Sequence, residues 1–435
     1  MKPINVGLLG SGTVGGGTFR VLQRNSEEIT RRAGCAIRIA VVADKDVARA
    51  KTVAGDAARV TADALEVVND PQIDVVVELI GGYTIAKELM LKAIANGKHV
   101  VTANKALLAL HGNEIFSAAR ERGVMVGFEA AVGGGIPIIK SLREGLTANR
   151  IEWIAGIING TSNFILSEMR DKGAAFADVL KEAQGKGYAE ADPTFDIEGV
   201  DAAHKLAIMA AIGFGIPVQF GKAHVEGISK LAQEDIRYAG ELGYRIKLLG
   251  IAKRKASGFE LRVHPTLIPE RQLIANVEGV MNAILVKGDA VGQTMYYGAG
   301  AGAEPTASAV VADLVDVARA LTADPQHRVP HLAFQHDRLS DVPVLPMGEV
   351  ETSYYLRLRV ADKTGALADI TKIFADQGIS IEALVQKPHA GEEYVDIILL
   401  THLTREKKID VAIRSIEALP VVSGKITRIR MEALL

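Results

Sequence analysis

The sequence predicts an α/β protein, and two patterns along its 435 residues indicate that class. In the N-terminal segment, residues 1–130, short runs of Val and Ile alternate with helical patterns, which is typical of a parallel sheet covered by helices on both faces. In the C-terminal segment, residues 351–435, strands and helices are expected in the order βαββαβ. Residues 131–323 are expected to form a central α+β domain, and a proline-containing linker, residues 324–350, precedes the last domain.

The N-terminal segment is expected to contain five short strands buried on both faces. Their apolar runs cover residues 4–9, 36–43, 75–79, 99–102 and 124–128. Helical periodicity covers residues 84–95 and 107–122. Strands and helices that alternate in this way form βαβ units and a parallel sheet.

The central segment opens on a glycine-rich turn, residues 130–137, and a helix expected to continue to about residue 147. A strand over residues 150–158 and an apolar helix over residues 200–212 follow. A second glycine-rich break, residues 297–308, precedes a helix over residues 309–321, which we expect to pack back on the first domain.

The C-terminal segment is expected to be ferredoxin-like, because βαββαβ is the order of that arrangement. The predicted strands cover residues 354–360, 379–386, 394–401 and 425–430. The predicted helices cover residues 365–376 and 408–419.

Composition excludes several classes of protein. Lys and Arg number 50 against 52 Asp and Glu, so the net charge of −2 argues against a nucleic-acid partner. The single cysteine, Cys35, excludes a disulfide framework, an iron–sulfur cluster and a zinc site with two thiolates, and it favours a reducing compartment. No apolar run has the length of a signal peptide or a membrane span, so we expect a cytoplasmic protein with no membrane partner.

A glycine-rich loop follows the first strand directly and opens the next helix. In Gly10-Ser11-Gly12-Thr13-Val14-Gly15, glycine permits the tight turn and the approach of a pyrophosphate to the backbone. The helix N-terminus then offers N–H groups and a positive dipole to the phosphates. This context predicts a Rossmann dinucleotide-binding domain whose cofactor contacts are Gly10, Gly12, Thr13, Val14 and Gly15. A plain tight turn is the alternative.

The acid expected after the second strand is Asp44. It lies 29 residues after Gly15, beyond the usual spacing of about 20 residues. Asp44 would bind a ribose 2′-hydroxyl and favour NAD, whereas Lys45 beside it would pair with a 2′-phosphate and favour NADP. We expect use of both cofactors, although Asp44 could instead cap the following helix.

The lone cysteine restricts the hydride chemistry. Oxidation of an aldehyde to an acyl product generally proceeds through a cysteine adduct, and Cys35 lies far along the chain from any expected active-site loop. Interconversion of an alcohol and a carbonyl, which needs a proton donor, is therefore favoured. His327 and His331 have i,i+4 spacing, but Pro330 between them breaks a helix, so we expect a surface loop and no metal.

Two lysines are candidates for the proton donor. Lys105 follows the fourth expected strand, at the sheet edge where ligands bind, but it could be an ordinary solvated lysine. Lys205 lies in the apolar helix one turn after Asp201, and a stabilising pair on a wet face is its alternative role. A dense acidic stretch, which contains Glu190, precedes this helix and would suit a substrate with an ammonium group.

Six separated motifs together resemble homoserine dehydrogenases, over roughly residues 1–330. They are GLLGSGTVGGG, VVTANKALLA, GGGIPIIKSL, GIINGTSNFIL, AQGKGYAEADPTFDIEGVDAAHKLAI and GAGAGAEPTASAVVADL. The resemblance implies reversible NAD(P)H-dependent reduction of L-aspartate 4-semialdehyde to L-homoserine, on the route to threonine and methionine. It also implies that the central segment, residues 131–323, supplies the substrate site and the dimerisation surface.

The resemblance also implies roles for single residues. Lys205 matches the catalytic lysine, and Lys105 matches the lysine near nicotinamide and substrate. Glu190 and Asp201 match substrate-holding positions, and Gly187 and Gly302 match backbone approaches to cofactor and substrate. Family members bind sodium through main-chain oxygens, which here would be those of Glu129, Val132, Gly134 and Ile136. Carbonyl oxygens suit such a hard ion, and a purely structural turn is the alternative.

The C-terminal segment resembles a regulatory amino-acid-binding ACT module. Its signature turn is expected at Asp362, Gly365, Ala366 and Leu367, where backbone N–H groups would capture a carboxylate. The resemblance implies a threonine effector and a homodimer or homotetramer built by edge pairing. An oligomerisation domain without a ligand is the alternative.

Two rival functions remain at this stage. A non-catalytic amino-acid sensor would bind the dinucleotide without turnover, but it would not need the proton donor that Lys105 or Lys205 offers. A related Rossmann oxidoreductase would act on another small carbonyl derived from an amino acid.

Overall fold

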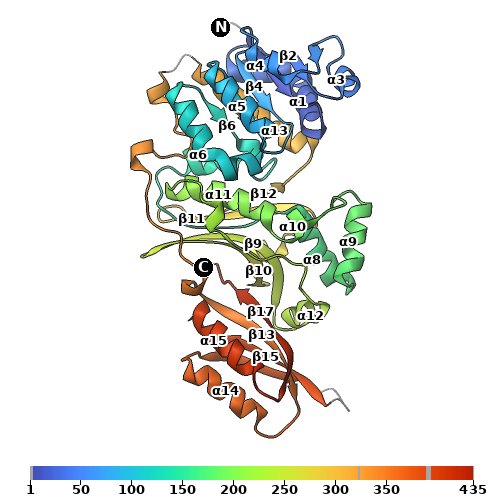
Figure 1. The fold of residues 1–435 in the computed structure, drawn as a ribbon, viewed down its shortest axis with the longest axis vertical. Helices are drawn as coiled ribbons and strands as arrows, with labels where there is room; N and C mark the ends of the chain where they lie inside the picture. Colours follow the sequence, from blue (N-terminus) through green and yellow to red (C-terminus); the bar gives the residue numbers. More distant parts are fainter. Residues whose placement is uncertain (1–2, 322–323, 388–392, 435) are drawn as a thin grey trace. The chain divides into compact units, whose positions relative to one another are not determined.

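The computed structural model describes residues 3–321, 324–387 and 393–434 (Figure 1). The chain divides into two compact units. The first contains Met1–Gly160, Val200–Ala223 and Val280–Val342, and the second contains Thr161–Gly199, His224–Gly279 and Pro343–Leu435. The expected division at residues 130, 323 and 350 stays a prediction.

The first unit contains a six-stranded parallel sheet in the order β3-β2-β1-β4-β5-β6, which is the Rossmann order. Its strands are β1 (Ile4–Leu9), β2 (Ile37–Ala43), β3 (Arg59–Thr61), β4 (Val75–Glu78), β5 (His99–Thr102) and β6 (Val126–Gly127). The strand order reverses between β1 and β4, and ligands bind at the carboxyl ends of strands beside such a switch point. The predicted fold class is confirmed.

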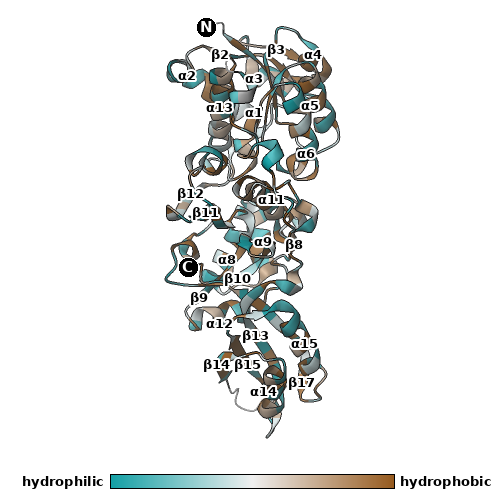
Figure 2. Cartoon of the chain, turned by 90° about the vertical axis from the view of Figure 1, so that its left-hand side faces the viewer, coloured by the Kyte–Doolittle hydropathy of each residue, from teal (hydrophilic) through white to brown (hydrophobic). Residues whose placement is uncertain are grey.

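Helices cover both faces of this sheet (Figure 1). They are α1 (Thr13–Arg24), α2 (Ser26–Ala33), α3 (Val47–Ala54), α4 (Ala64–Asn69), α5 (Ile85–Ala95), α6 (Lys105–Glu121) and α13 (Ala303–Ala320). Helix α2 is largely hydrophilic (Figure 2), and only Ile29 and Ala33 of it are buried. Apolar residues of α1, α2 and α13 share one core with β1, β2 and β4.

Helix α13 begins six residues earlier than the sequence pattern predicts. Residues 303–308 belong to the helix. Pro305 is tolerated there because it lies in the first turn, where a missing N–H costs no helical hydrogen bond. Gly302, at φ +123°, directly precedes this helix. The carbonyl oxygen of Ala303 would lie 2.5 Å from a Cβ at Gly17, so α1 and α13 approach closely.

The rest of the first unit holds a small antiparallel sheet and the apolar helix. The strands are β7 (Ile151–Ile157), β11 (Met281–Gly288) and β12 (Gly292–Ala299), with β11 in the centre. The helix expected up to about residue 147 is instead a short α7 (Ile138–Lys140) followed by a π-helical turn, Ser141–Gly145. Helix α11 (Val200–Phe214) is buried along almost its whole length.

The second unit is built on a sheet in the order β9-β10-β17-β13-β15-β14. Its strands are β8 (His224–Val225), β9 (Tyr244–Lys255), β10 (Gly258–Pro269), β13 (Glu351–Ala361), β14 (Ile381–Lys387), β15 (Tyr394–Thr401), β16 (Thr404–Arg405) and β17 (Val422–Met431). Its helices are α8 (Gly160–Lys172), α9 (Phe176–Gly185), α10 (Thr194–Ile197), α12 (Gln233–Glu241), α14 (Ala366–Asp376) and α15 (Glu406–Glu417). Strands β13, β14, β15 and β17 with α14 and α15 form the expected βαββαβ module around its own core.

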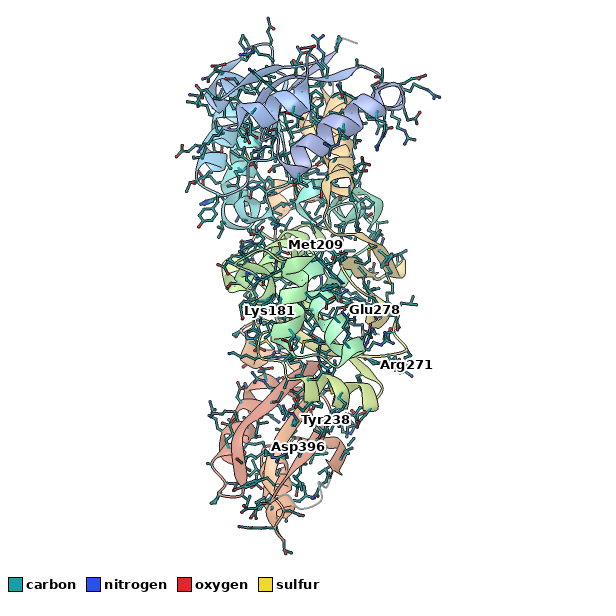
Figure 3. All side chains as sticks on the ribbon, turned by 90° about the vertical axis from the view of Figure 1, so that its right-hand side faces the viewer. Lys181, Met209, Tyr238, Arg271, Glu278 and Asp396 are labelled. Atoms are coloured by element: carbon teal, nitrogen blue, oxygen red, sulfur yellow. The ribbon has the colours of Figure 1, made fainter. Side chains whose placement is uncertain are left out.

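Strand β17 joins this module to the central strands. Thr266 and Leu267 of β10 pair in parallel with Arg430 and Met431 of β17. On the other side, the hydroxyl of Tyr238 in α12 donates to Asp396 Oδ2 of β15 at 3.1 Å, and Figure 3 labels both residues. The C-terminal module is therefore part of the second unit's sheet.

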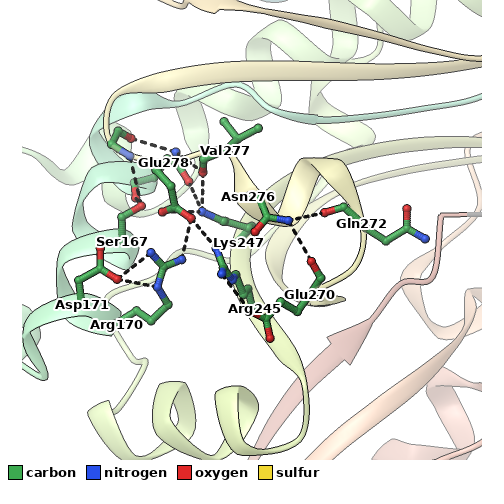
Figure 4. Close-up of polar contacts among 12 residues, drawn as sticks. Ser167, Arg170, Asp171, Arg245, Lys247, Glu270, Gln272, Asn276, Val277 and Glu278 are labelled. Atoms are coloured by element: carbon green, nitrogen blue, oxygen red, sulfur yellow. Dashed lines mark hydrogen bonds and ion pairs between the residues drawn. The ribbon is translucent and has the colours of Figure 1, made fainter.

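A polar cluster ties α8 to β9 (Figure 4). Glu278 Oε1 accepts from Arg170 at 2.7 Å and from Arg245 at 2.8 Å. The buried ammonium of Lys247 donates to the Val277 carbonyl at 2.6 Å, and burial lowers the pKa of Lys247 to about 8. These contacts provide hydrogen-bond partners for the Lys247 ammonium and for Glu278 Oε1.

No helix in the described part of the chain is both long and apolar enough to cross a membrane.

Candidate functional site

The glycine loop after β1 is shaped by close backbone contacts. Gly10 has φ +95°, a backbone conformation that residues other than glycine rarely adopt. A Cβ at Gly15 would lie 2.0 Å from the Gly10 carbonyl oxygen, so only glycine lets α1 begin this close to the strand. A Cβ at Gly12 would meet no atom within 4 Å. The loop is therefore tightly packed at Gly10 and Gly15 and open at Gly12.

A cavity of about 930 Å³ lies beside this loop at the carboxyl ends of the strands. Gly10, Gly12, Asp44, Lys45 and Arg49 line it, so the loop and the end of β2 face the same space. Thr13 and Val14 open α1 directly after Gly12. The volume of the cavity and its place beside the glycine loop suit a dinucleotide.

Asp44 is anchored at the edge of this cavity. Its Oδ2 accepts from the Ser11 N–H at 2.7 Å and from the Ser11 hydroxyl at 2.6 Å, and Arg49 donates to both oxygens at 3.0 Å. Burial alone would raise the pKa of Asp44, but these hydrogen bonds outweigh burial and hold the pKa well below its usual range. Asp44 therefore stays ionised and oriented toward the loop.

Arg49 was missed by the sequence analysis. It is a half-exposed side chain on α3, a helix that the apolar pattern did not predict. Asp46 caps this helix by accepting from the Arg49 N–H at 3.0 Å. An Asp three residues before a basic residue, after the second strand, was the available signal.

The second candidate centre is a buried carboxylate between two lysines. Asp201 Oδ2 lies 2.7 Å from the Lys205 Nζ, and Asp201 Oδ1 lies 3.1 Å from the Lys105 Nζ. The Asp201 and Lys205 side chains are 4% and 10% exposed, whereas that of Lys105 is 38% exposed. The possibility that Asp201 and Lys205 pair on a wet face is therefore wrong, because α11 is buried there.

Neighbouring groups fix this centre. Lys205 Nζ also donates to the Ile158 carbonyl at 2.8 Å, and the Asn159 side-chain amide donates to Asp201 Oδ2 at 2.9 Å. Burial would raise the pKa of Asp201, but the charges of Lys205 and Lys105 outweigh it and hold the pKa well below its usual range. Asp201 is therefore a permanent anion that compensates two cations.

Lys105 is positioned by the loop after β5. It is the first residue of α6, and Asn104 caps that helix by accepting from the Leu107 N–H at 3.1 Å. The Asn104 amide also donates to the Gly82 carbonyl at 2.6 Å. Buried Glu78 accepts from the Gly81 N–H at 3.0 Å, and burial raises its pKa. These contacts hold two loops together at the sheet edge, and no pattern in the sequence predicts them.

His204 adjoins Lys205 on α11. Its ring packs edge-on against Phe220 with centroids 4.2 Å apart. Burial lowers the pKa of His204 to about 4, so the imidazole is neutral near pH 7. The centre therefore gains no third positive charge from this histidine.

Gly187 and Glu190 lie in the second unit between α9 and α10, and both are exposed. Gly187 has φ +73°. The nearby acids do not all gather around a lysine: Asp192 accepts from the Thr194 N–H at 3.1 Å, and Asp196 from the Thr161 hydroxyl at 3.4 Å. Asp201 is the acid of this stretch that contacts Lys205.

The glycine-rich turn after β6 surrounds a buried pair of carboxyl groups. The Glu129 side chain accepts from the N–H groups of Ile139 and Lys140 at 2.9 and 2.8 Å, and the Glu129 N–H donates to Asp313 Oδ2 at 2.8 Å. Burial raises the pKa of Glu129 to about 7 and that of Asp313 to about 8. Asp313 was not anticipated.

Main-chain oxygens of this turn are available to a cation. Among the described residues, no hydrogen-bond donor reaches the carbonyls of Val132 and Gly134. The Ile136 carbonyl accepts from the Ile138 N–H at 2.8 Å, and the Glu129 carbonyl accepts from the Val132 N–H at 3.3 Å. The described residues contain no cluster of three or more His, Cys, Asp or Glu side chains that could hold a metal. His331, expected on a surface loop, is instead stacked on Phe116 and accepts from the Val126 N–H at 3.1 Å.

The signature turn of the C-terminal module is open. Gly365 has φ +92° and precedes α14, and a Cβ there would meet no atom within 4 Å. Asp362 is exposed, while Ala366 and Leu367 pack on the module core.

Comparison with known proteins places each part of the chain. Family models match at residues 10–129 (homoserine dehydrogenase, NAD binding domain), 137–315 (homoserine dehydrogenase) and 354–421 (ACT domain). The chain is 64% identical to a homoserine dehydrogenase of Pseudomonas aeruginosa and 61% identical to one of Neisseria gonorrhoeae, each alignment covering 100% of both chains.

Solved structures agree. A homoserine dehydrogenase from Thiobacillus denitrificans superposes with a TM-score of 0.96 at 70% identity, over 100% of this chain and 99% of that one. A hyperthermophilic archaeal homoserine dehydrogenase in complex with NADPH superposes with a TM-score of 0.63 at 26% identity, over 73% of this chain and 98% of that one.

Proposed function

The chain belongs to the homoserine dehydrogenase family, as an NAD(P)-dependent enzyme of amino-acid biosynthesis with a C-terminal ACT domain, and from this premise we propose that Lys205 moves the proton when L-aspartate 4-semialdehyde and L-homoserine are interconverted. The observation that supports this role is the buried contact of 2.7 Å between Lys205 and Asp201. A buried, charged lysine is costly unless a specific partner compensates it.

The nicotinamide, when bound, supplies or accepts the hydride at the alcohol carbon. Lys205 gives a proton to the carbonyl oxygen in the direction of reduction and takes it back in the direction of oxidation. An ammonium group has three N–H donors, and those directed at Asp201 and at the Ile158 carbonyl fix its orientation. Asp201 holds Lys205 and Lys105 near one another in spite of their like charges.

We propose further contacts with substrate or cofactor for four residues, Lys105, Gly187, Glu190 and Gly302. Lys105 stands at the sheet edge beside Asp201 and would face both nicotinamide and substrate. Glu190 and Gly187 are exposed on the second unit, and a carboxylate such as that of Glu190 suits the ammonium group of an amino acid. Gly302, at the N-terminus of α13, would leave room for the backbone to approach the cofactor.

The cofactor choice rests on Asp44, Lys45 and Arg49. Asp44 suits the ribose 2′-hydroxyl of NAD, while the exposed Lys45 and the half-exposed Arg49 suit the 2′-phosphate of NADP. Arg49 pairs with Asp44 in this structure and would turn to the phosphate when NADP binds. We propose that both cofactors are used.

A sodium ion fits the turn after β6. Val132 and Gly134 offer carbonyl oxygens that no described donor reaches, and hard monovalent ions prefer such ligands. Glu129 and Ile136 would complete the set through their main-chain oxygens.

The ACT turn at Asp362 and Gly365 is our candidate site for a threonine effector, and pairing of ACT sheets between subunits would give a homodimer or homotetramer. The lone, buried Cys35 supports placement in a reducing compartment, the cytoplasm. The boundaries near residues 130, 323 and 350 are likewise proposed.

Turnover tests the proposed function. The purified chain should reduce NADP or NAD only when L-homoserine is added, with L-aspartate 4-semialdehyde as the product. Binding of the dinucleotide without homoserine-dependent turnover would favour the non-catalytic sensor. Faster turnover with another small amino alcohol would favour a different oxidoreductase.

A further inference from the structure

A second cavity, of about 850 Å³, lies within the second unit between the ACT module and the loop after β8. Helix α15 and strand β17, adjacent in Figure 1, form one wall, and residues 225–231 form the other. Its apolar lining consists of Val225, Leu231, Pro265, Ile413, Ile426 and Ile429. This site is separate from the ACT turn at Asp362 and from the dinucleotide cavity.

Most of the charged residues that line this cavity are already paired. Arg428 Nη1 lies 2.5 Å from Asp410 and 2.9 Å from Glu406. Glu226 accepts from Arg430 at 2.8 and 2.9 Å, and Lys425 pairs with Glu417 at 2.6 Å. These charges are compensated within the protein.

Three charged side chains in the lining are different. Within the described part of the chain, no oppositely charged group lies within ion-pair distance of Lys230, Arg414 or Glu198, although all three line the cavity. Lys230 and Arg414 are exposed, whereas Glu198 is half-buried. A Cβ at Gly227 would lie 2.6 Å from Glu198 Oε2, so this glycine lets the loop pass directly against the Glu198 carboxylate.

Two uncompensated cations and one carboxylate complement a ligand with two anionic groups and one ammonium group. An α-amino acid with an acidic side chain carries that set of charges, whereas a nucleotide has no ammonium group for Glu198. We propose that this cavity is a regulatory site for an acidic α-amino acid, with Lys230 and Arg414 as the anion ligands and Glu198 as the ammonium ligand.

The position of Glu198 in the chain explains why a ligand here would regulate. Glu198 is followed by Gly199, at φ +80°, and then by the first residue of α11. A Cβ at Gly199 would lie 3.1 Å from Val263 Cγ1, so the backbone is closely packed at this point. Asp201, which holds Lys205, comes only three residues after Glu198. A ligand that draws Glu198 into the cavity therefore acts on the start of the helix that carries the proposed proton donor.

Calorimetric titration of the full-length enzyme with L-aspartate tests the proposal. We expect saturable binding, weaker binding of succinate, which lacks the ammonium group, and weaker binding of L-threonine, which lacks the second anion. The double variant Lys230→Gln/Arg414→Gln should lose roughly tenfold or more in affinity, since hydrogen bonds to charged groups dominate such sites. Glu198→Gln should weaken L-aspartate more than succinate.

The controls separate this cavity from the other sites. Lys181→Gln changes an exposed lysine on α9 (labelled in Figure 3) that does not line the cavity, and it should bind L-aspartate as the wild type does. L-Aspartate resembles the substrate and would also fit the active site, so a second control is needed. The double variant should keep its KM for L-homoserine, which shows that its loss of L-aspartate affinity does not come from a changed active site. Binding is read out independently of turnover, so failure of this proposal leaves the proposed dehydrogenase function intact.

Three results would overturn the proposal. They are the absence of heat from L-aspartate at millimolar concentration, unchanged affinity in the double variant, and loss of affinity in Asp362→Asn but not in the double variant. The last result would place the amino acid at the ACT turn. L-threonine binding as tightly as L-aspartate, and lost with the same variants, would refute the charge argument.

Discussion

Replacement of Lys205 by methionine should reduce kcat without unfolding the protein. Methionine retains a long unbranched side chain but removes the ammonium group. Asp201 would keep a counter-ion, because the Lys105 Nζ lies 3.1 Å from its other oxygen. Loss of an acid–base group costs about 10²–10⁴ in kcat. That range corresponds to about 3–5 kcal/mol of transition-state stabilisation.

The assay is steady-state oxidation of L-homoserine, followed by NADPH absorbance, together with fluorescence titration of NADPH binding. Lys205→Met should lose the rate and keep cofactor affinity to within a few-fold, and Lys181→Met on α9 should match the wild type. Lys205→Arg sharpens the test, because arginine keeps the ion pair but does not deprotonate in proteins. It should stay slow. Near-wild-type rate in the methionine or the arginine variant would refute the reasoning and leave Lys205 as half of a structural ion pair.

Three further predictions follow from the other sites. Arg49→Gln should raise the KM for NADP by roughly tenfold, because a charged hydrogen bond is lost, and should change the KM for NAD little. Lys51→Gln, on the exposed side of α3, is the control. Equal effects of Arg49→Gln on both cofactors would contradict the assignment. Burial raises the pKa of Asp313 to about 8, so the folded protein holds a proton that the unfolded chain releases near pH 4. The contribution of Asp313 to stability is therefore present below pH 4 and is lost as the pH rises toward 8. Asp313→Asn should therefore flatten the fall of Tm between pH 5 and 8, while exposed Asp341→Asn should not. Gly365→Ala, at φ +92°, should weaken threonine inhibition with kcat unchanged, whereas Gly424→Ala, at φ +75° in the same module, should leave inhibition intact.

Deletion of residues 351–435 is a poorer test of regulation than a point variant. Strand β17 pairs with β10, and Arg430 of β17 is buried and bound to Glu226. Removing the module would expose this edge and take away the Arg430 partner of Glu226, which would keep its contact with His224. A loss of activity after truncation would then report instability as well as regulation.

The sequence predicts best the strands that are buried on both faces, because burial alone determines their residue pattern. Strand β1, residues Ile4–Leu9, is wholly buried, so its apolar run coincides with the element. Helix α2 is largely polar, and α3 is only eight residues long with its Val and Ala residues interrupted by Arg49, Lys51 and Thr52, so no apolar run marks either helix. The start of α13 was misplaced because Gly302 and Pro305 signal a break in sequence, whereas in the fold they cap and begin a helix.

In the candidate site, the sequence predicts the contact within one helix but not the contacts between different elements. Asp201 and Lys205 are one helical turn apart, so their pairing follows from local spacing, and it is observed at 2.7 Å. Lys105 and Asn159 reach Asp201 from other elements, and such contacts depend on tertiary packing that periodicity does not encode. Burial of the pair was missed for the same reason.

The most direct test of the central claim is a crystal structure of the enzyme with cofactor and L-homoserine bound. We expect the Lys205 Nζ within hydrogen-bond distance, about 2.6–3.2 Å, of the reacting hydroxyl oxygen or joined to it by one water, while its contact with Asp201 is retained. A hydroxyl oxygen that instead contacts another proton donor, with Lys205 held only by Asp201 and Ile158, would contradict the account.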